Sequence, residues 1–183
     1  MDAFHFTLSQ EEKDYLKNLV RLRIEDRLAG RPGTTPEPPT DRLREKFGAF
    51  VTLTLHGRLR GCIGHIVGDR PLFQTIGDMA EAAAFEDPRF PSLTAREFQD
   101  VAIEISILSP LTACPDPELV AVGRHGLFIR RGNHSGLLLP QVPVEWHWNR
   151  EQFLDQTCVK AGLSPGCWKL PGTTLFWFEA EVF

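Results

Sequence analysis

The most chemically reactive side chain in the sequence is that of Cys62, which stands between Gly61 and Gly64, just after Arg60. Glycine weakens the interior of a strand, so this spacing indicates a bulge or the close approach of another molecule to the backbone. The thiolate is the reactive form of cysteine, and a nearby cation such as Arg60 lowers the pKa of a thiol. We therefore predict a functional site at Cys62. The alternative, a thiol packed beneath a turn beside glycines that only allow close strand contacts, stays open.

A catalytic thiol also needs a group that accepts or donates a proton. The sequence offers histidines and glutamates for this role without showing which of them lies close: His65, His134, His147, Glu104 and Glu145. We single out Glu145, because an ionised carboxylate among apolar and aromatic residues must be exposed, paired or protonated. A general acid or base, a substrate anchor and a salt bridge with Arg60 are equally open for it. Glu104, in the middle of an apolar segment, is more typical of a structural pair.

The remaining cysteines are not predicted to be reactive. Cys158 lies on the apolar stripe of a predicted helix, where a buried and inert side chain is expected. Cys114 and Cys167 are given no role. Cys62 and His65 in a C-x-x-H spacing, together with Cys158 or Cys167, have the chemistry of a zinc site, but no second closely spaced pair of ligands is present. We therefore predict no metal site, and the sequence leaves any cofactor unknown.

Residues 50–63 predict a β-hairpin that positions the cysteine. A three-residue loop at 56–58 pairs the apolar residues of the two strands with one another: Leu55 with Leu59, Leu53 with Gly61, and Val51 with Ile63. Thr52 then faces Cys62 across the hairpin. In this register Arg60 and Cys62 lie two residues apart on the same face, where the guanidinium is able to act on the thiol.

The rest of the chain predicts helices and strands joined by hairpins and irregular connections. Ser9 and Glu12 form a capping box before an amphipathic helix that stops at Gly30, and a proline-rich loop follows at 31–39. Asp69 is the predicted N-cap of a second helix. Further elements are expected as follows: that helix from about 72 to 85, a short turn of helix at 94–97, a strand at 101–108, a hairpin at 126–139, a helix opened by Asn149 and Gln152, and an aromatic strand at 174–183. This order favours an α+β fold with a mostly antiparallel sheet flanked by helices.

Composition excludes several classes of protein. The chain of 183 residues is long enough for one large domain, and its net charge of −4 disfavours nucleic-acid binding. No apolar run has the length of a membrane span, and the first residues lack the pattern of a signal peptide. Four cysteines in a chain of this length do not indicate a disulfide framework, so we expect a reducing cytoplasm.

Several segments together resemble the AMMECR1 domain family, in the same order and over nearly the whole chain. They are Phe50-Val51-Thr52-Leu53 with Leu59-Arg60-Gly61-Cys62-Ile63-Gly64, Asp87-Pro88-Arg89-Phe90, Ile103 to Leu108, Gly136 to Val142 with Glu145, Phe153-Leu154, and Cys158 to Leu163 with Trp168. The resemblance implies a single domain over residues 1–183, built of a larger and a smaller intertwined subdomain with a cleft between them. It also implies that the segment from Leu59 to Gly64 is the functional site.

The resemblance suggests two kinds of function. The first is small-molecule binding or thiol-dependent catalysis by Cys62, Arg60 and Glu145, with further residues expected to line the site: Gly61, Gly64, His65, Glu104, Cys158 and Trp168. Because prokaryotic members are often encoded beside a Memo-like protein and a radical-SAM protein, the second is an adaptor that docks on such partners. Tryptophans such as Trp168 are able to stack on a flat ligand, although closing a core is their more common role.

Overall fold

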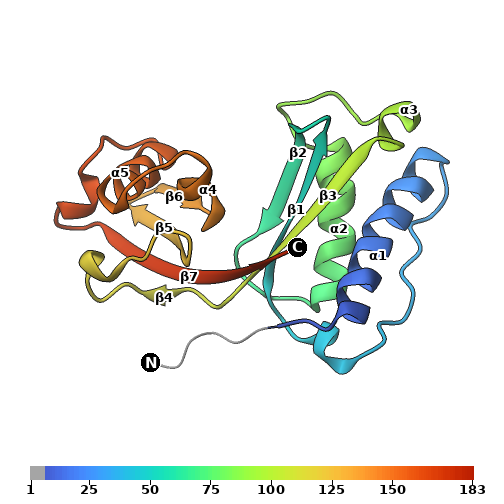
Figure 1. The fold of residues 1–183 in the computed structure, drawn as a ribbon, viewed down its shortest axis with the longest axis horizontal. Helices are drawn as coiled ribbons and strands as arrows, with labels where there is room; N and C mark the ends of the chain where they lie inside the picture. Colours follow the sequence, from blue (N-terminus) through green and yellow to red (C-terminus); the bar gives the residue numbers. More distant parts are fainter. Residues whose placement is uncertain (1–6) are drawn as a thin grey trace. The chain divides into compact units, whose positions relative to one another are not determined.

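The computed structural model describes residues 7–183, which form an α+β fold with antiparallel strands and flanking helices, as predicted (Figure 1). The chain divides into two compact units. The first unit contains residues 7–108 and 181–183, and the second contains residues 109–180. Residues 1–6, where we predicted no signal peptide, lie outside the described residues.

The first unit begins with helix α1 (Gln10–Leu28), and its predicted capping box is confirmed. The Ser9 hydroxyl accepts a hydrogen bond from the Glu12 backbone at 3.2 Å, and the Glu12 carboxylate accepts one from the Ser9 backbone at 2.7 Å. The predicted apolar stripe is buried: Leu16, Leu19, Val20 and Ile24. The helix ends just before Gly30, whose φ of 66° is a backbone conformation that glycine adopts without steric cost.

The sheet of the first unit has three antiparallel strands in the order β2-β1-β3, and Phe183 hydrogen-bonds to the outer side of β3. The strands are β1 (Gly48–Leu55), β2 (Arg58–His65) and β3 (Val101–Leu108). Helices α1 and α2 (Leu72–Phe85) lie side by side on one face of this sheet (Figure 1). Strand β2 is therefore an edge strand, and the Cys62 segment lies along that edge.

Alternation along β1 separates the two faces of this sheet. Val51 and Leu53 are fully buried against the helices. Because successive side chains of a strand point to opposite faces, Thr52 points away from α1 and α2. Cys62 lies opposite Thr52 on β2 and shares that face, so the helices do not cover the side of the sheet that carries Cys62.

The predicted hairpin register is confirmed near the cysteine, and it is wrong at the loop. Thr52 faces Cys62, and the neighbouring pairs Leu53–Gly61 and Val51–Ile63 are also as predicted. The loop has two residues and not three, with positive φ angles of 50° at His56 and 75° at Gly57, as a tight type I′ hairpin turn requires. The register shifts after Leu53, and Arg60 is the extra residue of the resulting β-bulge. The bulge makes the shorter loop compatible with the predicted pairing further along.

The connection from β2 to β3 contains two helices. Helix α2 has the predicted bounds, but it begins directly after Pro71 and has no side-chain cap, so the predicted capping role of Asp69 is wrong. Proline needs no partner for a backbone N–H at a helix start, which reduces the need for a cap. Helix α3 (Ala95–Phe98) carries the predicted capping box, in which Thr94 and Glu97 exchange hydrogen bonds.

The second unit contains the two strands of the predicted hairpin. It also contains the predicted last helix, which opens with the expected capping box of Asn149 and Gln152. Its strands follow the order β4-β7-β5-β6, and helix α5 packs on β5 and β6. The elements are β4 (Thr112–Ala113), β5 (His125–Arg131), β6 (His134–Leu138), α4 (Gln141–Glu145), α5 (Arg150–Lys160) and β7 (Thr174–Val182), whose last two residues belong to the first unit. Three short 3₁₀ helices complete the described chain: η1 (Asp41–Arg44), η2 (Pro117–Leu119) and η3 (Cys167–Lys169).

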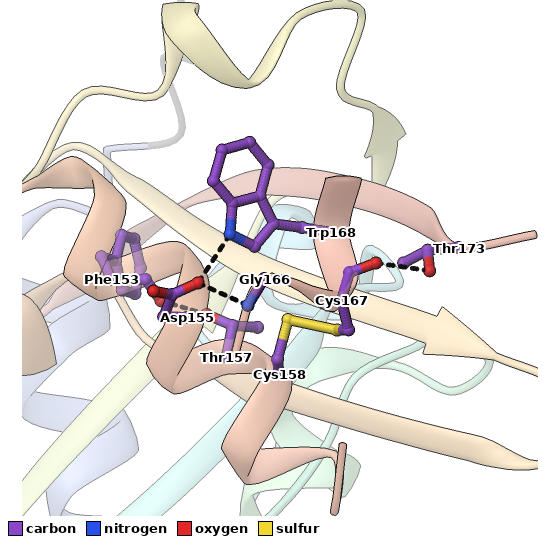
Figure 2. The surroundings of a disulfide bond; sticks show 8 residues. All are labelled: Phe153, Asp155, Thr157, Cys158, Gly166, Cys167, Trp168 and Thr173. Atoms are coloured by element: carbon purple, nitrogen blue, oxygen red, sulfur yellow. Dashed lines mark hydrogen bonds between the residues drawn. A yellow bond between two sulfur atoms is a disulfide. The ribbon is translucent and has the colours of Figure 1, made fainter. Parts of the chain in front are cut away.

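A disulfide bond joins Cys158 of α5 to Cys167 of η3, with 6.0 Å between their Cα atoms (Figure 2). Cys158 is buried as expected, but it is bonded to Cys167, so the expectation that Cys167 has no role is wrong. Asp155 supports the same junction, because its Oδ1 atom accepts hydrogen bonds from Gly166 N at 2.7 Å and from Trp168 Nε1 at 2.8 Å (Figure 2). The sequence did not predict this pair, because the helical pattern of α5 does not show that the chain turns back onto the helix at η3.

Candidate functional site

Cys62 lies at the outer end of a row of three side chains that crosses the sheet of the first unit, with Thr52 in the middle. Thr52 of β1 faces Cys62 on one side and Glu104 of β3 on the other. Directly opposed residues on antiparallel strands have Cβ atoms about 5 Å apart, so the three side chains are neighbours on one face. The Thr52 hydroxyl donates a hydrogen bond to Cys62 Sγ at 3.1 Å. We call Cys62, Thr52 and Glu104 the Cys62 row.

The backbone of Cys62 is held on its outer side by the turn that follows α2. Asp87 Oδ2 accepts a hydrogen bond from Cys62 N at 2.9 Å, and Arg89 Nη2 donates one to Cys62 O at 3.2 Å. Asp87 and Arg89 also bind each other through two contacts, of 2.9 Å from Nε and 2.7 Å from Nη2. The Asp87 side chain is 2% exposed, whereas that of Arg89 is 50% exposed. We call this arrangement the Asp87–Arg89 clamp.

The charges around Cys62 favour the protonated thiol. Burial raises the pKa of the half-buried Cys62 thiol, and the Asp87 and Glu104 carboxylates raise it further. The Thr52 hydrogen bond and the positive charge of Arg89 lower that pKa without cancelling the effect of burial. The hydrogen bond from Arg89 holds the pKa of the Asp87 carboxyl far below its usual range, so the clamp remains charged at neutral pH. Cys62 is therefore a neutral thiol beside a fixed ion pair.

Arg60 is not the electrostatic partner that the sequence predicted for Cys62. The guanidinium binds the Glu97 carboxylate through Nε at 3.0 Å and Nη2 at 3.2 Å, and Nη2 also donates to Ser92 O at 3.4 Å. This pair lowers the pKa of Glu97 to about 2. The cation that acts on the thiol is Arg89, because the bulge at Arg60 commits its side chain to α3. Within residues 7–183, Arg60 Nη1 is buried and has no hydrogen-bond partner.

The two predicted glycines serve close approaches of the chain. A Cβ atom at Gly61 would lie 2.0 Å from the carbonyl oxygen of Ala83 in α2, so only glycine lets β2 pack against that helix. A Cβ atom at Gly64 would lie 2.3 Å from the ring of Phe50. Both glycines thus fix the position of β2 on either side of Cys62, which matches the structural alternative for them.

The remaining predicted residues lie elsewhere in the two units. His65 is exposed at the end of β2 and lines a depression of only about 30 Å³ with Asp69. Glu145, for which a general acid or base, a substrate anchor and a salt bridge with Arg60 were left open, is exposed at the end of α4 in the second unit, and Arg60 pairs with Glu97. Trp168 and Cys158 of that unit belong to the junction described above, where the disulfide removes Cys158 as a thiolate ligand.

Three residues of the site were not singled out from the sequence, namely Asp87, Arg89 and Glu97. The sequence does contain two patterns that include them: Asp87 and Arg89 lie on either side of Pro88, and Glu97 belongs to a predicted capping box. Neither pattern shows which part of the sheet the turn contacts. Their partners are 25 to 37 residues away in sequence.

Comparison with known proteins decides the family. The family model described as AMMECR1 matches residues 17–183. The chain belongs to the AMMECR1 family. A protein of Thermococcus onnurineus is 44% identical over 191 residues, covering 97% of this chain and 92% of its own. A protein of Methanothermobacter thermautotrophicus is 40% identical over 183 residues, covering 96% and 95%.

An AMMECR1-type fold has also been solved in a related protein. The crystal structure of the uncharacterized protein PH0010 from Pyrococcus horikoshii matches with a TM-score of 0.89 and 37% identity, covering 96% of this chain and 91% of that one. The names of these three relatives state no activity. No helix within residues 7–183 is both long enough and apolar enough to cross a membrane.

Proposed function

We propose that the Cys62 row of this AMMECR1-family protein binds a small molecule and presents the Cys62 thiol to it. The Asp87–Arg89 clamp carries the proposal, because it holds both backbone polar groups of Cys62 while the side chain stays half-buried and hydrogen-bonded to Thr52. A site that acts on a ligand needs its reactive group held in place before the ligand arrives. The clamp supplies this for Cys62.

The site suits one class of reaction, the addition of the thiol across a polarised double bond, in which the sulfur attacks once a base has taken its proton. In such an addition the S–H bond breaks, an S–C bond forms at the electrophilic carbon, and the proton ends on the other atom of the former double bond. No oxidant or further reactant is consumed. Glu104 is the carboxylate of the Cys62 row and is the candidate for passing the proton.

Alkylation by iodoacetamide, followed by mass spectrometry on native protein, tests this proposal. The Cys114→Ser variant leaves Cys62 as the one free thiol among residues 7–183, since Cys158 and Cys167 are joined. We expect Cys62 to react without unfolding and its rate to go on rising above about pH 8.5, the ordinary pKa of a cysteine, because burial raises the pKa of this thiol. Reaction only after unfolding, or a rate already at its plateau below pH 8, would contradict a half-buried protonated thiol.

Thr52 and Thr54 provide a matched pair of variants for the same assay. Only Thr52 contacts the sulfur, although both lie on β1 and share a face. Loss of the hydroxyl in Thr52→Val removes a hydrogen bond to the thiolate, so alkylation at pH 7.5 should slow about three- to tenfold. Thr54→Val should leave the rate unchanged. Equal effects of the two variants would show that the Cys62 row does not act as a unit.

A second candidate function is an adaptor that docks on a radical-SAM or Memo-like partner. It is supported by the position of β2 at the sheet edge and by Leu59, which is 43% exposed on it. Purified partner proteins should then be retained by the wild-type chain and lost with Leu59→Gln. Retention that does not change in this variant would exclude the hairpin as the docking surface.

A further inference from the structure

An open surface pocket of about 480 Å³, which we call the hairpin-tip cavity, lies at the tip of the β1–β2 hairpin, apart from the Cys62 row. Its lining consists of Leu55, His56, Arg58, Leu59 and Arg60. The tight turn at His56 and Gly57, where both φ angles are positive, brings the ends of the two strands close together. Cavities of about 300–1,000 Å³ are the usual size for small-molecule sites. The volume is therefore sufficient for a small organic ligand.

The hairpin-tip cavity is lined by apolar side chains and by basic side chains. Leu59 is 43% exposed and supplies apolar surface beside the basic groups. None of the lining residues is acidic, and His56, Arg58 and Arg60 are basic. The protein as a whole carries a net charge of −4, so a basic lining departs from its average. Apolar surface beside basic groups fits a ligand that has both an apolar part and an anionic group.

The two arginines of the cavity differ in what holds them. The Arg60 side chain is only 9% exposed, and Glu97 neutralises its charge. Arg58 is exposed, and no carboxylate within residues 7–183 forms a salt bridge with it. An exposed arginine without an acidic partner is able to bind a carboxylate or phosphate through two parallel hydrogen bonds. Of the two arginines, Arg58 is therefore the one free to pair with an anion, and Arg60 is part of the fixed wall.

We propose that the hairpin-tip cavity binds an amphipathic anion, a small molecule with one carboxylate or phosphate group on an apolar chain. The anionic group pairs with Arg58, and the apolar chain covers Leu55 and Leu59. This site does not require the Cys62 thiol, so it goes beyond the function proposed for the Cys62 row. Arg60 precedes Cys62 by two residues of β2, about 7 Å along the strand, which allows one ligand to reach from the cavity towards the thiol.

Titration of the ¹⁵N-labelled protein with sodium octanoate, followed by NMR, tests the proposal, with 1-octanol as the uncharged probe of equal chain length. We expect saturable shifts of the backbone amides of residues 55–60, and binding of octanol at least tenfold weaker. Arg58→Gln should weaken octanoate binding about tenfold or more, because a charge-assisted contact is lost. Arg96→Gln, which removes an exposed arginine of α3 in the same unit, is the matched control and should bind like the wild type.

Three outcomes would overturn the proposal. One is the absence of saturable shifts at the hairpin tip, and another is equal binding of octanoate and octanol. The third is equal weakening by Arg58→Gln and Arg96→Gln, since only general electrostatics would then be at work. Cys62→Ser separates this proposal from the preceding one, because octanoate binding should survive the loss of the thiol. Octanol titrations of both arginine variants should be unchanged, which checks that the cavity is still folded.

Discussion

Replacing Asp87 by asparagine should show how strongly the Asp87–Arg89 clamp stabilises the protein. The carboxylate is nearly fully buried, and it accepts hydrogen bonds from the backbone of Cys62 and from the guanidinium of Arg89. Asparagine keeps the shape of the side chain and loses its charge. Loss of one partner of a buried ion pair typically costs about 3–5 kcal/mol. Because half of the Arg89 side chain is in water, we expect a smaller loss of about 2–3 kcal/mol in the free energy of unfolding.

Thermal unfolding, monitored by circular dichroism, measures this loss. For a chain of 183 residues, 2–3 kcal/mol corresponds to a fall in Tm of about 5–10 °C. Asp100→Asn is the matched control, because Asp100 is an exposed aspartate of the same unit. If Asp87→Asn unfolded within about 1 °C of this control, the clamp would not stabilise the fold and the argument for a held thiol would fail.

The pH dependence gives a second check on the same residue. The pKa of Asp87 is lower in the folded protein than in the unfolded chain, where it is about 3.9. Stability from the ionised carboxylate is therefore fully present above that unfolded value and is lost as the pH falls towards the folded pKa. The difference in unfolding free energy between wild type and Asp87→Asn should be constant from about pH 5 to 8 and shrink below about pH 4. A difference that grew on acidification would refute the assigned direction of the pKa shift.

Two further predictions concern other contacts of the fold. Reduction of the Cys158–Cys167 disulfide should lower the free energy of unfolding by about 2.5–3 kcal/mol, because the bond closes a loop with a sequence separation of 9. Thiol titration in denaturant should count two more thiols after reduction than before it. Equal counts would show that the bond is not formed. Gly61→Ala should destabilise the protein by about 2–3 kcal/mol in urea unfolding, because its Cβ would lie 2.0 Å from Ala83 O. Gly77→Ala, inside α2, is the control, because its Cβ would lie 3.5 Å from Arg23 Nη1, an ordinary contact, and it should be neutral or stabilising. Equal losses in the two variants would contradict the assigned contact at Gly61.

Local patterns in the sequence were sufficient for the elements and for the register near Cys62. Alternation of apolar and polar residues fixes which side of β1 is buried, because a shift by one residue would exchange the two faces. The same alternation does not distinguish a three-residue loop from a two-residue turn followed by a bulge. The position of Arg60 depended on that difference, and its predicted role beside the thiol was therefore wrong.

Contacts between distant segments were not accessible from the sequence. Nothing local to Asp87 shows that its carboxylate reaches the backbone of Cys62, 25 residues earlier. The disulfide presents the same difficulty in a short segment, since pairing depends on how η3 approaches α5 and not on the number of residues between Cys158 and Cys167. Family resemblance gave the fold and pointed to the Cys62 segment, and only the folded chain shows which groups surround the sulfur.

The Asp87–Arg89 clamp also has a purely structural interpretation, because β2 is the edge strand of its sheet. Unpaired N–H and C=O groups on an edge invite pairing with another chain, and the clamp covers those of Cys62 with a carboxylate and a guanidinium. Protection of the edge involves only the backbone groups of residue 62, so it does not depend on which side chain that residue carries. The hydrogen bond from Thr52 to the sulfur is not required for edge protection. Thr52→Val therefore discriminates between the two interpretations, because it leaves the edge covered and changes only the thiol.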